Sequence, residues 1–218
     1  EGLPGAGELW TLMLAALAVL SLVLGNVVAI AQTSIRRMLA YSTVAHVGFI
    51  LLGFVTGTPD GIQSALFYTL VYVVMAAGAF GFLTVLGARG EEVEELDDLR
   101  GLWQRSPWFA LMMLLLMVSM IGIPPLAGFY AKWWVLSALV ATGHTTLALV
   151  ALVASVVGAY YYLRVIRLML FDDGGRADTA GAPLDVRLVL SANALLLVVI
   201  GIAPDRLLDL CARAAALI

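Results

Sequence analysis

Lys132 and His46 are two residues of this chain whose side chains could exchange protons inside an otherwise apolar environment. Lys132 lies in the segment GIPPLAGFYAKWW (122–134), with more than about twenty uncharged residues before it and about ten after it. His46 lies in the segment YSTVAHVGF (41–49). Burial destabilises the charged form of an amine, and a free imidazole titrates near neutral pH. These residues therefore indicate reversible proton exchange.

A predicted helix break precedes the lysine. The uncharged stretch 107–142 would be about 54 Å long as one helix, far more than a bilayer needs. Pro124 and Pro125 lack backbone donors, and Gly122 and Gly128 permit unusual backbone angles. We predict that the helix breaks near 122–128 and resumes through 129–140. Unpaired backbone groups at that depth mark ion sites in transporters, so we expect Lys132 to serve such a site rather than extend to the membrane surface.

His46 has two interpretations. A core histidine that makes one structural hydrogen bond is as consistent with the sequence as a member of a proton relay. Tyr41, Ser42 and Thr43 lie three to five residues earlier, so some of them can share its helix face and hold water. Three amides in apolar stretches are expected to form hydrogen bonds between helices rather than to conduct: Asn26, Gln63 and Asn193.

The elements that carry these residues are membrane-spanning helices. Of the 218 residues, 62% are hydrophobic and 12% are charged, which excludes an ordinary soluble domain. The apolar runs are continuous rather than alternating, so they predict helices and not the strands of a barrel. We predict an all-α polytopic transmembrane bundle of six spans, at 9–31, 38–57, 61–88, 107–142, 145–163 and 188–204.

The basic residues predict the topology of these spans. Nine of the twelve Lys and Arg residues lie in alternate loops: Arg36, Arg37, Arg89, Arg100, Arg105, Arg164, Arg167, Arg176 and Arg187. The loops at 56–60 and 141–144 contain neither Lys nor Arg. The positive-inside rule therefore places the basic loops in the cytoplasm and both ends of this chain on the outer side.

The acidic residues, the cysteine and the net charge of the chain do not indicate a functional site. The acidic stretch EEVEELDDLRG (91–101) is expected to be a solvated, partly helical surface segment. Cys211 is the one cysteine, and a small apolar filler is its expected role. We predict no metal site and no cofactor-binding site, because the chain has no cluster-binding cysteines, G-x-G-x-x-G motif or P-loop. The net charge of −3 gives no indication of nucleic-acid binding.

Four segments together resemble the antiporter-like membrane subunits of respiratory complex I, which are related to Mrp-type cation/proton antiporters. AQTSIRRMLAYSTVAHVGFILLG (31–53) is similar to a signature of the family, and SMIGIPPLAGFYAKWWVL (119–136) is similar to its broken twelfth helix. LRGLWQRSPWFALMM (99–113) and YYYLRVIRLMLF (160–171) resemble the subunit N branch, the homologue of mitochondrial subunit 2.

The resemblance implies that the six spans correspond to helices 9–14 of a fourteen-helix subunit. This chain would then hold the second five-helix repeat, at about 8–171, and the closing helix, at about 186–205, as a fragment without the N-terminal half. Lys132 falls on the helix-12 position of the family, and His46 falls on the helix-10 histidine that helps to connect its half-channels.

The function implied is proton translocation within a bacterial NADH-quinone oxidoreductase of the plasma membrane. Nicotinamide, flavin, iron–sulfur clusters and quinone would then belong to partner subunits, among them neighbouring antiporter-like subunits, and no redox chemistry would occur in this chain. Two alternatives are a subunit of an Mrp-type antiporter or membrane-bound hydrogenase, and a non-conducting structural fragment.

Overall fold

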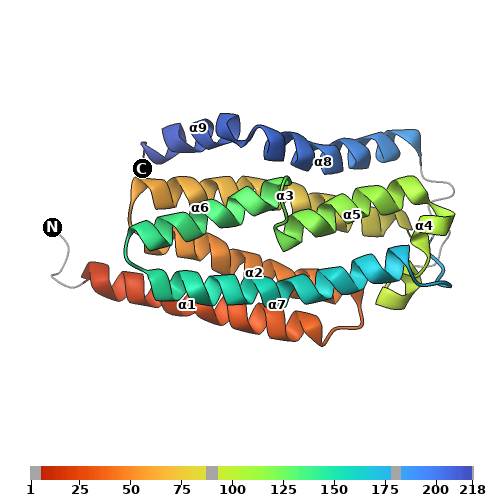
Figure 1. Ribbon diagram of the computed structural model, residues 1–218, viewed down its shortest axis with the longest axis horizontal. Coiled ribbons are helices and arrows are strands. Elements are labelled where there is room, and N and C mark those ends of the chain that lie inside the picture. The colour runs from red at the N-terminus through yellow and green to blue at the C-terminus, as the bar shows by residue number, and fades with distance from the viewer. Residues whose placement is uncertain (1–5, 87–92, 178–182, 218) are drawn as a thin grey trace.

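The fold is a bundle of long, roughly parallel and antiparallel helices, seen in a computed structural model that describes residues 6–86, 93–177 and 183–217 (Figure 1). The helices are α1 (Ala6–Ile30), α2 (Ile35–Val55), α3 (Pro59–Leu86), η1 (Leu96–Leu99), α4 (Leu102–Arg105), α5 (Pro107–Ile121), α6 (Ala127–Ala141), α7 (Thr145–Leu170), α8 (Leu184–Ile202) and α9 (Pro204–Ala215). Within the described residues, five helices (α1, α2, α3, α7 and α8) are long and apolar enough to cross a membrane. The predicted all-α membrane bundle is confirmed.

Helices α5 and α6 lie in the stretch predicted as one span (107–142), and they are interrupted where the sequence predicted a break; α5 is a shorter apolar helix than the five spanning ones. Helix α5 begins at Pro107, a residue suited to a first helical position because it needs no backbone donor there. It ends at Ile121, and α6 begins at Ala127. The peptide bond between Pro124 and Pro125 is cis. In Figure 1 the two half-helices lie along the bundle with the break near its middle.

Close contact between α1 and α2 depends on glycines. A Cβ atom at Gly25 would lie 2.6 Å from the backbone nitrogen of Ala45, and one at Gly48 would lie 2.9 Å from the carbonyl oxygen of Ala18. Small residues let membrane helices approach until their backbones touch. This approach holds the helix that carries His46 directly against the helix that carries Asn26.

The start of α1 and the end of α9 lie at one end of the bundle, whereas η1 and α4 lie at the other (Figure 1). The basic loops meet at the η1 end, where Ser34 pairs with Glu95 and the Arg105 guanidinium donates to the carbonyls of Gly174 and Ala177. Arg89 lies outside the described residues. The predicted grouping of the basic loops is thus present at the η1 end, although Arg206 and Arg213 lie on α9, whose end is at the other end of the bundle.

The acidic stretch differs in part from its prediction. Its partial helicity is confirmed by η1, but Leu96, Asp98 and Leu99 are buried rather than solvated. Asp98 accepts hydrogen bonds from the amides of Glu94 and Glu95 and pairs with Arg176 at 2.7 Å. The expectation of solvation was wrong for these residues because the segment closes over the ends of the helices. Glu91 and Glu92 lie outside the described residues.

Residues after the last predicted span form a further helix, α9, which packs against α3. The Gln63 amide donates to the carbonyl of Leu208 at 3.1 Å, and Cys211 is buried in the same contact region, as expected for a small apolar filler. The sequence pattern did not predict this helix, because its apolar residues cover only one face. Helix α8 also approaches the break, since a Cβ at Gly201 would overlap the Pro125 carbonyl oxygen at 2.0 Å.

Candidate functional site

The candidate site begins at the end of α5, where one residue adopts a left-handed backbone conformation. Gly122 has a φ of +89°, in the left-handed region that favours glycine. The amides of Gly122 and Ile123 both donate to the carbonyl of Val118, at 3.1 and 3.3 Å. Such a closure satisfies only some of the four carbonyls that a helix end leaves without partners. The carbonyls of Met120 and Ile121 remain for another donor.

Lys132 supplies that donor. Its Nζ donates to the carbonyl oxygens of Met120 and Ile121 at 3.0 and 2.8 Å, and to Oγ of Ser155 on α7 at 2.9 Å. An ammonium group has three protons, so all of them are used. The two carbonyls also form the negative end of the α5 dipole, which favours a cation. The half-buried lysine therefore folds back onto the break and does not extend to the membrane surface.

Gly128 sets the distance between the two half-helices. Its amide donates to Oγ of the fully buried Ser119 at 3.1 Å, and a Cβ at this position would lie only 1.8 Å from the carbonyl oxygen of Ser119. Only a residue without a side chain allows α6 to start so close to α5. Lys132 follows one turn later, so this approach places its amine within reach of the α5 carbonyls.

An aromatic ring also contacts the amine. Nζ of Lys132 lies 5.4 Å from the ring centroid of Phe49, which is buried on α2. The Phe49 ring in turn stacks on Tyr68 of α3, with centroids 5.7 Å apart. A cation at this distance from an aromatic face is attracted by the ring quadrupole. The contact gives the protonated lysine a further source of stabilisation beside its hydrogen bonds.

His46 is buried among tyrosines. Its Nδ1 lies 2.8 Å from the hydroxyl of Tyr68, its Nε2 lies 3.0 Å from the hydroxyl of Tyr162, and its ring stacks on Tyr72 with centroids 4.6 Å apart. A neutral imidazole has one donor nitrogen and one acceptor nitrogen, so one tyrosine hydroxyl donates to the ring and the other accepts from it. Both ring nitrogens are thereby connected to hydroxyl groups.

A cavity of about 10 Å³ brings these groups together. The polar side chains in its wall are Asn26, His46, Lys132, Ser155, Tyr161 and Tyr162. Its volume is about that needed for a single water molecule, and polar walls are what a buried water requires. We call it the inner cavity. Lys132 and His46, which are 86 positions apart in the sequence, thus face one water-sized space.

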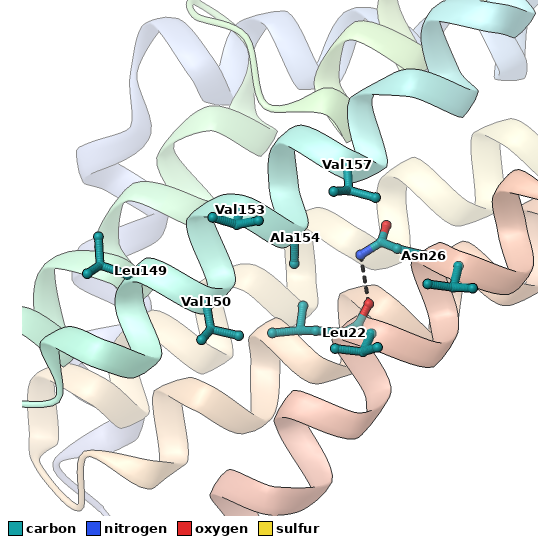
Figure 2. Close-up of a pocket in the computed structure, with 9 residues that line it drawn as sticks. Leu22, Asn26, Leu149, Val150, Val153, Ala154 and Val157 are labelled. Atoms are coloured by element: carbon teal, nitrogen blue, oxygen red, sulfur yellow. Dashed lines mark hydrogen bonds between the residues drawn. The ribbon is translucent and has the colours of Figure 1, made fainter.

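Two grooves flank the inner cavity on opposite sides of α7. Figure 2 shows the first, an apolar groove of about 390 Å³ between α1 and α7, in which Asn26 is the polar side chain and donates to the carbonyl of Leu22 at 2.8 Å. Asn26 and Ala154 belong to both this groove and the inner cavity. The second groove, of about 650 Å³, is lined by residues of α6 and α7, and it shares Lys132 and Ser155 with the inner cavity.

The polar residues that precede His46 in α2 differ in burial and in hydrogen bonding. Ser42 is buried but donates to the carbonyl of Leu39, and Oγ1 of Thr43 accepts from the Tyr72 hydroxyl at 2.7 Å. Tyr41 is 39% exposed and faces away from the core. The polar partners of His46 come instead from α3 and α7, which sequence spacing along one helix could not identify.

Ser155, Tyr68, Tyr161 and Tyr162 are among the site residues that sequence reasoning missed. Tyr162 lies in the triplet YYY (160–162), which was noticed only as a family likeness. Ser155 is the one hydroxyl residue between Thr146 and Tyr160, an isolated polar group in an apolar run. That isolation was the available signal, because a lone hydroxyl in a membrane helix requires a partner.

The three amides behave differently from one another. Oδ1 of Asn26 accepts from the Tyr161 hydroxyl on α7 at 3.1 Å, and Gln63 bonds to α9, so the predicted interhelical role is confirmed for both. Oδ1 of Asn193 is buried on α8 and has no hydrogen-bond partner among the residues that the structure describes. The prediction was wrong for that atom, which lies against Gly78 of α3.

Comparison with known proteins gives consistent similarities. Residues 3–158 match the family described as NADH:quinone oxidoreductase/Mrp antiporter, TM. NADH-quinone oxidoreductase subunit N of Thioalkalivibrio sulfidiphilus is 54% identical over 214 residues, which cover 98% of this chain and 45% of that protein. The chain therefore spans about half the length of the curated relatives it matches.

Two solved structures extend the comparison to the fold. A chain of respiratory complex I from Thermus thermophilus with bound aureothin superimposes with a TM-score of 0.80 at 34% identity, covering 90% of this chain and 44% of that one. A chain of the Mrp complex from a Dietzia species gives a TM-score of 0.85 at 22% identity, covering 95% and 47%. The second likeness is one of fold alone.

Proposed function

This chain belongs to the NADH:quinone oxidoreductase/Mrp antiporter transmembrane family, and on that premise we propose that it translocates protons as part of an NADH-quinone oxidoreductase. One observation carries the proposal. The single lysine of the chain closes the end of a broken membrane helix and lines a water-sized cavity together with a buried histidine. Burying a charge at this depth is costly, so a titratable group placed there indicates a function beyond satisfying the carbonyls of Met120 and Ile121.

Lys132 is the group that binds and releases the proton. As an ammonium it donates hydrogen bonds to the carbonyls of Met120 and Ile121 at the end of α5 and to the hydroxyl oxygen of Ser155. On release, the proton passes to water in the inner cavity and then toward His46 through the hydroxyl of Tyr162, which lies 3.0 Å from Nε2. The groove along α6 and α7 gives the amine a second approach, from the opposite side. A group with access from two sides can take up a proton from one and deliver it to the other.

Energy for this transport comes from outside the chain. Quinone reduction by partner subunits changes charges next to this one, and the change alters the proton affinity of Lys132 electrostatically. Nicotinamide, flavin, iron–sulfur clusters and quinone belong to those partners, and this chain performs no redox step. Its partners are other membrane subunits of complex I, neighbouring antiporter-like subunits among them, and the lipid bilayer.

The placement in the cell follows the same premise. We propose that the chain lies in the bacterial inner membrane as the second five-helix repeat and closing helix of a longer subunit. The basic loops at the η1 end of the bundle then face the cytoplasm, and both ends of the chain face the outer side. An Mrp-type antiporter or membrane-bound hydrogenase is the competing assignment, and the 54% identity to a subunit N of NADH-quinone oxidoreductase favours complex I.

Two substitutions in the full-length subunit, within the assembled complex, test the proposal. Lys132→Arg keeps a cation that cannot release its proton at physiological pH, and Lys132→Met removes the charge. Both should reduce the number of protons pumped per quinone reduced, measured in sealed vesicles, even where Arg preserves the thermal stability of the complex. An unchanged proton-to-quinone ratio in the Arg variant would refute the role of Lys132. A ratio that depends on added Na⁺ would favour the antiporter assignment, and a chain that assembles without affecting pumping would favour a structural fragment.

A further inference from the structure

Ser155 contacts the proton-bearing group in a way that the two other contacts of Lys132 do not. The carbonyls of Met120 and Ile121 can only accept hydrogen bonds, whereas a hydroxyl can accept or donate. In the structure Oγ of Ser155 accepts from Nζ at 2.9 Å. Within residues 6–86, 93–177 and 183–217, no protein acceptor takes the hydroxyl hydrogen of Ser155. That hydrogen is therefore available to the inner cavity, which Ser155 lines.

Counting donors shows what happens when the lysine loses its proton. A neutral amine has two hydrogens and one lone pair. Its hydrogens can keep both α5 carbonyls satisfied, provided that the third neighbour changes from acceptor to donor. Ser155 is the neighbour that can do so, by rotating its hydroxyl toward Nζ. All three contacts of Lys132 then persist in both protonation states, with only the direction of one hydrogen bond reversed.

From this geometry we propose, on the basis of the function proposed above, that Ser155 is the relay group through which Lys132 exchanges its proton with water in the inner cavity. An N–H bond of the ammonium breaks as an O–H bond to Oγ forms, and the original hydroxyl proton of Ser155 passes to the water. The serine is unchanged in composition, Lys132 becomes neutral, one proton has moved to the water, and no electrons are transferred.

The position of the pair supports a relay rather than a simple anchor. Lys132 and Ser155 are both part of the wall of the inner cavity and of the α6–α7 groove, so together they separate the two spaces. Ser155 is half-buried, and it lies on the face of α7 opposite the apolar groove shown in Figure 2. A proton that enters Lys132 from the groove therefore meets Ser155 on its way inward.

Two matched comparisons test the relay in the full-length subunit within the assembled complex. The first compares the parent subunit with Ser155→Ala, and the second compares Ser155→Thr with Ser155→Val. Threonine and valine have the same shape, but only threonine keeps the hydroxyl. Ser155→Ala and Ser155→Val should lower the pumping rate about tenfold, the factor expected from one lost hydrogen bond to a charged group. Ser155→Thr should retain pumping close to the parent value.

Parallel measurement of Lys132→Met separates this inference from the proposed function. Loss of pumping in Lys132→Met together with equal pumping in Ser155→Thr and Ser155→Val would overturn the relay while leaving the lysine as the proton site. Unchanged pumping in Lys132→Met would refute the proposed function itself. A rescue by threonine but not by valine, at equal thermal stability, supports the relay, since a purely structural role of the side chain would not distinguish the two.

Discussion

Replacing Gly128 by alanine should widen the helix break and separate Lys132 from it. A Cβ at this position would lie 1.8 Å from the carbonyl oxygen and 2.7 Å from the carbonyl carbon of Ser119. Both are backbone atoms of α5, which cannot turn aside as a side chain would. Because real Cβ contacts essentially never fall below 3.0 Å, the start of α6 must retreat by at least 1.2 Å.

The cost of that movement has two parts. Overpacking of a close-packed site destabilises by about 1–3 kcal/mol, and loss of the hydrogen bond from the Gly128 amide to Ser119 adds about 1 kcal/mol. A shift of 1.2 Å also stretches the bonds of Lys132 to the α5 carbonyls, now 2.8 and 3.0 Å, toward 4 Å. Misplacement of a reacting group by about 1 Å can reduce a rate up to about 100-fold. We expect a loss of about 2–4 kcal/mol of stability and at least about a tenfold loss of pumping.

Gly7 offers a matched control for this substitution. Like Gly128 it is the second residue of its helix, so both substitutions by alanine gain similar helix propensity, but nothing lies within 4 Å of a Cβ at Gly7. Thermal unfolding of the assembled complex and proton pumping in vesicles should be unaffected in Gly7→Ala and lowered in Gly128→Ala. If the two variants behave alike in both assays, the account of the break is wrong.

Two further substitutions probe the surroundings of the site. Burial raises the pKa of the Asp98 carboxyl, but hydrogen bonds from Arg176 and from the amides of Glu95 and Glu94 outweigh it and hold the pKa below its ordinary value. This stabilisation is present above the ordinary aspartate pKa of about 4 and is lost as the pH falls through the lower folded value. Hydrogen exchange of the Glu94 and Glu95 amides should therefore accelerate in acid, and in Asp98→Asn it should be faster than in the parent chain already at neutral pH. Equal amide exchange in the two chains at neutral pH would contradict the role given to the Asp98 carboxylate. Asn193→Leu should be neutral or stabilising by up to about 1–3 kcal/mol, since it removes an unpaired buried acceptor. Asn26→Leu should destabilise by a similar amount because it removes the acceptor of the hydrogen bond from the buried Tyr161 hydroxyl, and equal destabilisation of both variants by thermal unfolding would refute this interpretation.

Membrane spans were predictable from sequence because their cause is local. Each span needs only enough consecutive apolar residues to cross the bilayer, and the helix break needs only residues that cannot continue a helix. The helix from Pro204 to Ala215 was missed because it is amphipathic and short, so it lacks that signal. The burial of Asp98 was missed for a related reason. The burial of Asp98 depends on its ion pair with Arg176, which is 78 positions away. No residue of the acidic stretch indicates that partner.

Site residues divide along the same line. Lys132 and His46 could be proposed as candidates from the sequence because a charge or an imidazole in an apolar run is costly wherever it points. Their hydroxyl partners could not be recognised from the sequence. A hydroxyl group in a membrane helix costs little free energy, because it can form a hydrogen bond to the backbone of its own helix. Ser155 and Tyr162 become informative only when α7 is known to lie between the break and α2. The sequence thus supplied the candidate titratable groups, and the packing of the helices supplied the hydroxyl groups that contact them.

The hydrogen bonds at the break explain why a lysine and an interrupted helix occur together. A continuous helix would use the carbonyls of Met120 and Ile121 internally, and a cation beside it would have no acceptor at that depth. The break exposes both carbonyls at the negative end of the α5 dipole, which stabilises the ammonium. If a proton were lost without compensation, one acceptor would be unpaired at a cost of about 1–3 kcal/mol. A hydroxyl that reverses its hydrogen bond removes most of that difference. In the proposed relay, this reversal keeps all three contacts of Lys132 in both of its charge states.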